Sequence, residues 1–233
     1  MAGGKDYMRL DKFLTEAGAA SRREVKQLVR QGAVTVNGVP AKSAEQPVSE
    51  TDKITLRGMP VEGRRTVVLK LHKPAGFVTS TDDPRDRTVM ELIPEKYRAW
   101  GVAPVGRLDK ETEGLLLLTN DGALAHRLIA PKSEVEKVYF ARHEGCCTEE
   151  DVRAFAAGLT LKDGTLCKPA KLELIAPGES RVTVTEGKYH QVRRMLASCG
   201  CPVIYLRRER EGNISLDGLP SGAWEELPRD LFG

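Results

Sequence analysis

The chain has 233 residues, of which 40% are apolar and 30% are charged, and its net charge at neutral pH is +3. This length suits one large domain or a small domain followed by a medium one, and the mild positive charge permits nucleic-acid binding without requiring it. Only 5% of residues are aromatic, and the chain has neither the apolar core of a signal peptide nor a run of 18 apolar residues, so we expect a cytoplasmic protein without a membrane span or an extensive base-stacking platform.

The first sixty residues predict two short helices and a small sheet. Apolar residues at helical spacing indicate a helix over residues 10–17, and Ser21-x-x-Glu24 forms a capping box at the start of a second helix. The sequences VTVNG, with its tight Asn-Gly turn, and ITLRG indicate strands at 34–36 and 54–58.

The remainder of the chain predicts strands that cluster and helices that interrupt them irregularly. Strands are expected near 67–71, 115–119, 136–144, 172–174, 182–184 and 203–210, and helices near 123–130, 148–157 and 190–200. This order favours an α+β fold with a largely antiparallel, mixed sheet rather than regular βαβ units. In the strand that contains Tyr139, we assign Val138 and Phe140 to the apolar face and Lys137 and Tyr139 to the other face.

The segment 57–65 contains Gly, Pro and Arg and is interpreted as a linker. We therefore predict a small α/β domain over residues 1–62 and a larger domain over residues 63–233.

The second predicted helix carries a basic stripe on the face opposite its apolar residues. The stripe consists of Arg22, Arg23, Lys26 and Arg30. Together with the positive end of the helix dipole, it suits RNA phosphates, although a solvated basic face is the alternative. The sequence RLDKFLTEAGAASRREVKQLVRQGAVTVNG resembles the S4-type RNA-binding domain over about residues 8–58, and this resemblance implies that the stripe and Arg9 bind RNA.

Asp109 is the strongest candidate for chemistry, because it precedes a run of four leucines that predicts a buried strand. A carboxylate is already ionised at neutral pH and needs no base to act as a nucleophile, but it needs a nearby cation where water is excluded. Arg107 and Arg193 are the candidate cations. From the residues alone, a surface ion pair is the alternative for Arg107 and Asp109, a solvated helix residue for Arg193, and a packed strand residue for Tyr139.

Four stretches together resemble the pseudouridine synthases that act on ribosomal RNA, in the branch with an N-terminal S4-type domain. They are KPAGFV, GRLDKETEGLLLLTNDG, EKVYF and EGKYHQVRRM. The resemblance covers almost the whole chain and implies that Asp109 is the catalytic residue and that Arg193 pairs with it. It also places Tyr139 against the target uracil, with removal of the proton from C5 as a further role.

The resemblance also implies a set of residues that support the cleft. They are Lys73, Pro74, Arg107, Lys137, His190 and Gln191. His190 and Gln191 could hydrogen-bond the RNA backbone, while entry into the helix is the other role for His190. The sequence departs from the family at Glu211, which stands at a usually apolar position, and local packing is expected to differ there.

The implied reaction is isomerisation of a uridine to pseudouridine within an RNA chain. This reaction needs no redox change or energy input, and no cofactor is expected, since the chain lacks a phosphate-binding glycine loop. The target base must leave its stack to reach the carboxylate.

The expected partner is ribosomal RNA, either naked or in a partly assembled particle, and we expect a monomer. The segment TSTDDPRDRTV, the sequence RRER and a short end without a basic tail resemble the enzyme of the small-subunit (16S) RNA, with the large-subunit (23S) RNA as the alternative.

Two other classes of protein remain open at this point. One is a non-catalytic RNA-binding or ribosome-assembly protein. The other is a hydrolase of glycosidic bonds that pairs Asp109 with Glu111 or Glu113 and releases free uracil.

The cysteines give little evidence for a metal. The chain has five of them and no CxxC pair, and the single His-x-x-Cys from His143 to Cys146 is far from a zinc motif. We therefore expect reduced thiols and no metal.

Overall fold

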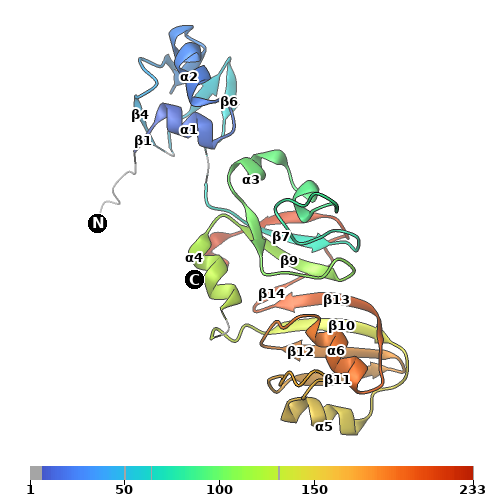
Figure 1. The fold of residues 1–233 in the computed structure, drawn as a ribbon. Helices are drawn as coiled ribbons and strands as arrows, with labels where there is room; N and C mark the ends of the chain where they lie inside the picture. The colour runs from blue at the N-terminus through green and yellow to red at the C-terminus, as the bar shows by residue number, and fades with distance from the viewer. Residues whose placement is uncertain (1–6, 50, 64, 131, 233) are drawn as a thin grey trace. The chain divides into compact units, whose positions relative to one another are not determined.

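The computed structural model describes residues 7–49, 51–63, 65–130 and 132–232, which form two compact units (Figure 1). One unit contains the described residues up to Thr66 together with Pro94–Val102, and the other contains Val67–Ile93 and the described residues from Ala103 on. The prediction that the N-terminal segment is not a signal peptide concerns in part residues 1–6, which lie outside the described residues. Within the described ranges, no helix is long and apolar enough to cross a membrane.

The first unit packs two helices against a four-stranded antiparallel sheet with the order β3-β2-β5-β6, and β1 pairs separately with β4. Its elements are β1 (Met8–Arg9), α1 (Leu10–Glu16), α2 (Arg22–Arg30), β2 (Val34–Val36), β3 (Val39–Pro40), β4 (Pro47–Val48), β5 (Ile54–Leu56), β6 (Met59–Val61) and α3 (Glu95–Ala99). The core is formed by fully buried side chains such as Leu10, Leu14 and Val25.

Local signals in the first unit correspond to the predicted elements, with one correction. The Ser21 side chain accepts a hydrogen bond from the Glu24 backbone, and the Glu24 carboxylate accepts one from the Ser21 backbone, so the capping box is present. The linker prediction for 57–65 is wrong in part, because β6 pairs with β5 across a tight turn in which Arg57 and Gly58 both have positive φ. The Gly-Pro composition marks a hairpin at this point rather than a linker.

The second unit is built on a nine-stranded mixed sheet, with the main order β11-β12-β10-β13-β9-β7-β15. Its strands are β7 (Val68–Lys73), β8 (Ala103–Val105), β9 (Glu113–Thr119), β10 (Lys137–His143), β11 (Lys171–Ala176), β12 (Glu179–Val184), β13 (Val203–Glu211), β14 (Ile214–Ser215) and β15 (Trp224–Leu227). Its helices are η1 (Val89–Leu92), α4 (Gly122–Ile129), α5 (Glu149–Ala157), α6 (Gln191–Ser198) and η2 (Arg229–Phe232). The predicted α+β fold with a largely antiparallel sheet is confirmed.

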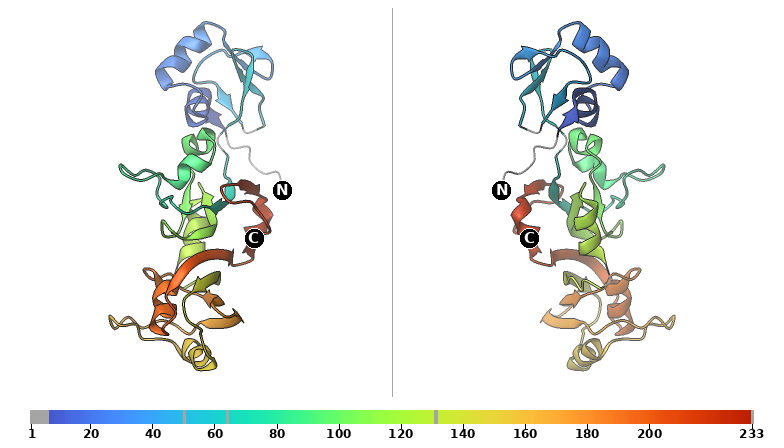
Figure 2. Two further views of the ribbon diagram at one scale, coloured as in Figure 1. Left: turned by 90° about the vertical axis from the view of Figure 1, so that its right-hand side faces the viewer. Right: turned by 90° about the vertical axis from the view of Figure 1, so that its left-hand side faces the viewer.

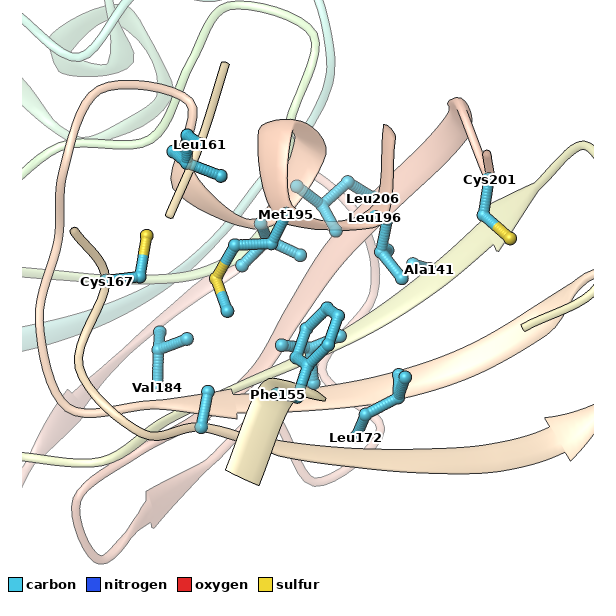
Figure 3. Close-up of a cluster of buried hydrophobic side chains, with 13 residues drawn as sticks. Ala141, Phe155, Leu161, Cys167, Leu172, Val184, Met195, Leu196, Cys201 and Leu206 are labelled. Atoms are coloured by element: carbon cyan, nitrogen blue, oxygen red, sulfur yellow. The ribbon is translucent and has the colours of Figure 1, made fainter. Parts of the chain in front are cut away.

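Helices α5 and α6 cover one face of the strands β10 to β13. Phe155 of α5 and Met195 of α6 are fully buried in an apolar cluster with Ala141 of β10 (Figure 3). Tyr139 packs partly against the same cluster, whereas Phe140 lies outside it and makes an edge contact with the Tyr205 ring. The predicted faces of this strand are therefore reversed at Tyr139, because the helices supply the apolar surface that covers its side.

The sheet consists of two antiparallel groups joined by one short parallel pairing between β9 and β13. Only Arg207 with Glu113 and Arg208 with Gly114 are paired there. Figure 2 shows the long, curved strand β13 in orange. Gly114 has φ +108°, and a Cβ atom at this position would lie 2.2 Å from the backbone oxygen of Arg208. This close approach requires glycine, and it brings the loop before β9 near the end of β13.

Candidate active site

Asp109 lies in the loop that joins β8 to β9. The strand that follows is firmly anchored, since the side chains of Leu115 to Leu118 are all fully buried. On the other side, the Thr79 hydroxyl donates a hydrogen bond to the Leu108 carbonyl at 2.8 Å and accepts one from the Leu108 backbone at 3.1 Å. The loop is therefore fixed on both sides of the carboxylate.

The ammonium group of Lys73 holds the same loop through backbone carbonyls. Its Nζ donates hydrogen bonds to the carbonyls of Pro74, Lys110 and Thr112 at 3.0, 3.0 and 2.8 Å, which uses all three of its protons. Burial lowers the pKa of Lys73 to about 8, although the nearby carboxylates, including Asp109, oppose this shift. Lys73 is therefore a positioning residue for the loop, and Pro74 takes part through its carbonyl.

Replacing this ammonium should loosen the loop. We expect Lys73→Met to lower the free energy of unfolding by roughly 2–4 kcal/mol, because three carbonyls lose their donor inside the protein. Folding lowers the pKa of Lys73 from 10.5 to about 8. Between these pH values the unfolded chain therefore binds more protons, and the stability of the wild type relative to the variant should rise with pH. Denaturant unfolding across this pH range measures both effects.

A suitable control is Lys70→Met in the same strand. The Lys70 ammonium is also buried, but it binds Glu225 at 2.8 Å and the Ser215 carbonyl at 3.2 Å rather than the Asp109 loop. The Lys70→Met substitution should lower the free energy of unfolding without slowing the reaction of the folded enzyme. Equal loss of rate in both variants would contradict the positioning role of Lys73.

The side chain that contacts the Asp109 carboxylate is a histidine rather than the expected arginine. Asp109 Oδ1 lies 3.3 Å from His190 Nε2. The Arg193 guanidinium instead makes long hydrogen bonds, of 3.4 to 3.5 Å, to the carbonyls of Val203 and Glu111 and to the Thr112 hydroxyl. The expected pair of Arg193 with Asp109 is thus not formed in this structure, although the Thr112 contact brings the guanidinium to the same loop.

A small pocket of about 70 Å³ brings most of the predicted residues together. Its lining includes Arg107, Asp109, Tyr139, His190 and Gln191. An adjoining cavity of about 460 Å³ shares Arg107 and Tyr139 with it and adds Lys137. A larger hollow of about 780 Å³ elsewhere in the second unit is lined by none of the predicted residues, so size alone does not identify the site.

Arg107 and Tyr139 border the two cavities in different ways. Arg107 is exposed and makes no hydrogen bond or ion pair with another described residue, which leaves its guanidinium available to a ligand. Tyr139 is partly buried, and burial raises its pKa above the ordinary value of 10, while the neighbouring Arg208 guanidinium opposes this shift. The phenol is therefore protonated at neutral pH.

The departure at Glu211 is explained by a buried ion pair. Glu211 Oε2 lies 3.1 Å from a terminal nitrogen of Arg208, and both side chains are almost completely buried. Burial lowers the pKa of the nearby Lys137, and the Glu211 carboxylate opposes that shift. The acid therefore balances Arg208 and Lys137 inside the cleft wall and does not lie on the outer surface.

Gln191 makes its hydrogen bonds within the protein. It is buried, its amide nitrogen donates to Glu186 Oε1 at 2.7 Å, and its amide oxygen accepts from the Lys188 backbone at 3.0 Å. Gln191 therefore holds the turn before α6, and a contact with the RNA backbone would have to replace these bonds. His190 stands at the N-cap position with left-handed φ, but its side chain makes no capping bond and is directed to Asp109 instead.

Sequence reasoning missed Tyr189 and Arg208. The Tyr189 ring is 76% exposed and stacks on the His190 ring at 3.9 Å between centroids, which leaves its outer face open beside the pocket. The Arg208 guanidinium neighbours Tyr139, and its Nε donates a hydrogen bond to the Leu115 carbonyl at 2.7 Å. The exposed aromatic in KYHQ was an available signal for Tyr189, whereas the role of Arg208 depends on a strand pairing distant in sequence.

The carboxylates required by a paired-acid hydrolase do not face Asp109. Glu113 Oε2 accepts a hydrogen bond from the Tyr205 hydroxyl at 3.2 Å, and Glu111 is exposed. Neither residue lines the pocket. Glu186 is the other acid in the lining, and it is held by Lys188 and Gln191.

In the first unit, the basic stripe is exposed on α2. Arg22, Arg23, Lys26 and Arg30 all lie opposite the buried apolar residues of that helix. Arg9 and Lys26 of the stripe both lie against Glu45, at 3.2 and 3.9 Å, and the Arg9 guanidinium also donates to Asp11 at 2.7 and 3.0 Å. Any contact of Arg9 with RNA would compete with this internal pair.

Comparison with known proteins identifies the family to which this chain belongs. The family model of RNA pseudouridylate synthase matches residues 67–198, and the S4 domain model matches residues 8–54. The RNA pseudouridine synthase YtzG of Bacillus subtilis (strain 168) is 42% identical over 96% of both chains. Ribosomal small subunit pseudouridine synthase A of Pseudomonas aeruginosa is 40% identical over 94% of this chain and 96% of its own.

Similarity extends to a large-subunit enzyme and to a solved structure. Ribosomal large subunit pseudouridine synthase B of Bacillus subtilis (strain 168) is 37% identical over 94% of this chain and 91% of its own. A crystal structure of a pseudouridylate synthase, 34% identical, covers 97% of this chain and 98% of its own with a TM-score of 0.67. The chain therefore belongs to the RNA pseudouridylate synthase family, the isomerases that act on RNA, and carries an S4 domain at its N-terminal side.

Proposed function

We propose that this enzyme isomerises one uridine of the small-subunit ribosomal RNA to pseudouridine and that Asp109 is its catalytic residue. The observation that carries the proposal is the Asp109 carboxylate itself. It is held in a fixed loop, yet its side chain is 35% exposed at a pocket that Tyr139 and Arg107 also line. A rigid anion that remains accessible is what attack on a flipped nucleotide requires.

The proposed reaction conserves all atoms of the substrate. The N1–C1′ bond of the uridine breaks, the uracil turns, a C5–C1′ bond forms, the proton on C5 leaves, and N1 takes up a proton in its place. Asp109 promotes the breaking of the N1–C1′ bond, and Tyr139 contacts the uracil. Arg193 balances the charge of the carboxylate once RNA displaces the guanidinium from its long hydrogen bonds.

We propose that residues 1–62 bind the RNA and that residues 63–233 perform the chemistry. The exposed stripe on α2 supplies phosphate contacts, and the free Arg107 adds one beside the pocket. The open face of Tyr189 is suited to stack on a nucleotide next to the target. The enzyme works on ribosomal RNA as a monomer in the cytoplasm.

The stripe predicts a salt-dependent affinity. We expect Arg22→Ala with Arg23→Ala to weaken RNA binding and to reduce the slope of log affinity against log salt by about two units, because each phosphate contact contributes about one unit. Arg142→Ala with Arg153→Ala removes the same charge from exposed positions of the second unit and should leave the slope nearly unchanged. Identical salt series for the two double variants would show that the stripe is only a solvated face.

The substrate is tested by offering both ribosomal RNAs. The enzyme is incubated with unmodified small-subunit RNA, large-subunit RNA and partly assembled particles of each, pseudouridine is mapped by sequencing, and free uracil is measured in the same tube. We expect one modified site in the small-subunit RNA and no free uracil. A site confined to the large-subunit RNA would overturn the choice of subunit, and release of uracil would overturn the isomerisation.

A further inference from the structure

The second unit holds a second group of reactive side chains outside the Asp109 pocket. The Sγ atoms of Cys147 and Cys201 and a ring nitrogen of His143 all lie within 4.8 Å of one another. His143 ends β10, Cys147 lies in the loop before α5, and Cys201 lies in the turn between α6 and β13. The segment that contains His143 and Cys147 thus meets the distant turn that contains Cys201, and we call these three residues the thiol site.

The imidazole of the thiol site is oriented as a metal ligand. Nδ1 lies 3.2 Å from the Glu144 carbonyl, which can only accept, so Nδ1 carries the proton and Nε2 carries the lone pair. Nε2 faces the Ser180 hydroxyl at 2.9 Å and Cys147 Sγ at 3.8 Å. A histidine that donates one nitrogen to a backbone carbonyl and presents the other to a cysteine sulfur has the orientation usual at zinc sites, and an ion bound at Nε2 would take the place of the Ser180 hydroxyl.

The spacing of the donor atoms also fits zinc. With Zn–S bonds of about 2.3 Å and Zn–N bonds of about 2.0 Å in tetrahedral geometry, sulfur and nitrogen ligands are about 3.6 Å apart and two sulfurs about 3.8 Å apart. The observed distance between Cys147 Sγ and His143 Nε2 is 3.8 Å, and no donor pair exceeds 4.8 Å. Closing the remaining gaps needs movements of less than about 1 Å.

Charge and burial favour the same ion. His143 and Cys201 are 4% and 1% exposed, so an isolated charge among them would be costly. Two thiolates neutralise one Zn²⁺, and binding releases their two protons to solvent. Cys147 is less buried than the other two ligands and gives the ion a path of entry.

We propose that His143, Cys147 and Cys201 bind one Zn²⁺ ion, with water in the fourth position. The site is structural rather than catalytic, because none of its residues lines the Asp109 pocket. Cys201 follows α6 closely, so the ion ties the end of that helix to the loop after β10. It thereby stiffens the helix that carries Arg193.

Two alternative roles of the thiol site are outcomes of the test. The thiols could act only as small apolar side chains, since Cys201 and Cys147 also contact the apolar cluster, or they could join as a disulfide under an oxidant such as a disulfide or peroxide. In both of these roles Nε2 of His143 stays hydrogen-bonded to the Ser180 hydroxyl. Figure 3 shows Cys201 at one end of the apolar cluster and Cys167 at the other, which makes Cys167 a buried control thiol.

The test measures zinc in the full chain. Protein purified in a phosphine reductant is stripped of metal, titrated with Zn²⁺ and desalted. The zinc content per chain is then measured by elemental mass spectrometry. We expect one zinc per chain for the wild type and for the controls Cys146→Ser and Cys167→Ser, and at least tenfold weaker binding for Cys147→Ser and Cys201→Ser. No zinc in a folded wild type, or full zinc in the two ligand variants, would overturn the site.

A second measurement avoids variants that fail to fold. The wild type is treated with an alkylating reagent with and without Zn²⁺, and each cysteine is quantified by peptide mass spectrometry. Zinc should slow the alkylation of Cys147 and Cys201 at least tenfold while Cys146 reacts equally in both samples. Equal alkylation of Cys147 and Cys201 with and without zinc, or their recovery as a disulfide from reduced protein, would overturn the proposal.

Discussion

Asp109→Asn is expected to abolish pseudouridine formation and to leave RNA affinity within a few fold of the wild type. Asparagine preserves the shape of the side chain and its contact with His190, but its amide is no nucleophile. The loop should remain in place, since Thr79 and Lys73 hold it through backbone atoms rather than through the carboxylate. Single-turnover reactions at saturating RNA, together with a binding assay, separate the two quantities.

Glu111→Gln is the matched control for this variant. Glu111 lies two residues away in the same loop, and its exposed carboxylate does not line the pocket. An isomerase that depends on one aspartate should tolerate its loss, whereas an enzyme with paired acids should not. Substantial pseudouridine formation by Asp109→Asn would remove Asp109 from the chemistry, whatever Glu111→Gln does.

Tyr139→Phe is expected to slow turnover about a hundredfold or more, the usual scale for loss of a general base. Because burial raises the pKa of Tyr139 above 10, less than about one molecule in a thousand is ionised at pH 7. If the ionised phenol removes the C5 proton, the wild-type rate should rise about tenfold per pH unit between pH 7 and 9. The variant lacks this group and should not share that rise.

The ratio of the two rates at each pH cancels the ionisation of the substrate itself. Tyr205→Phe serves as the control, because the Tyr205 hydroxyl binds Glu113 and Tyr205 does not line the pocket. A Tyr139→Phe enzyme that stays within a few fold of the wild type would show that only the ring matters. A large loss with a constant ratio across pH would assign the hydroxyl a hydrogen-bonding role instead of a proton transfer.

Sequence reasoning succeeded where short-range physics decides the structure. The capping box at Ser21 and the leucine run at β9 were predictable because caps and buried strands depend on neighbouring residues. The loop position of Asp109 followed from the same strand. The faces of β10 were not predictable, because they depend on which side α5 and α6 cover, and that is settled by chain segments well beyond Tyr139.

The errors within the site have the same origin. Glu211 is unexpected in sequence but compensated in space by Arg208, and Gln191 is committed to Glu186 in a turn that the helix pattern does not reveal. The contact of His190 with Asp109 joins residues from different elements, so spacing cannot predict it. Side-chain pairs of this kind arise from tertiary packing, whereas sequence patterns predict only which helices and strands form.

The short pairing of β9 with β13 has a consequence for the timing of activity during synthesis. Asp109 belongs to the strand group that contains β9, whereas Tyr139 and the helix with Arg193 belong to the group that contains β13. The ribosome makes β7, β8 and β9 of the first group well before β13, whereas β15 of that group follows β13 in the chain, and such long-range pairing forms slowly. If Asp109 acts together with Tyr139 and Arg193 as proposed, we expect a nascent chain to be inactive on RNA until β13 has left the exit tunnel and joined the two groups.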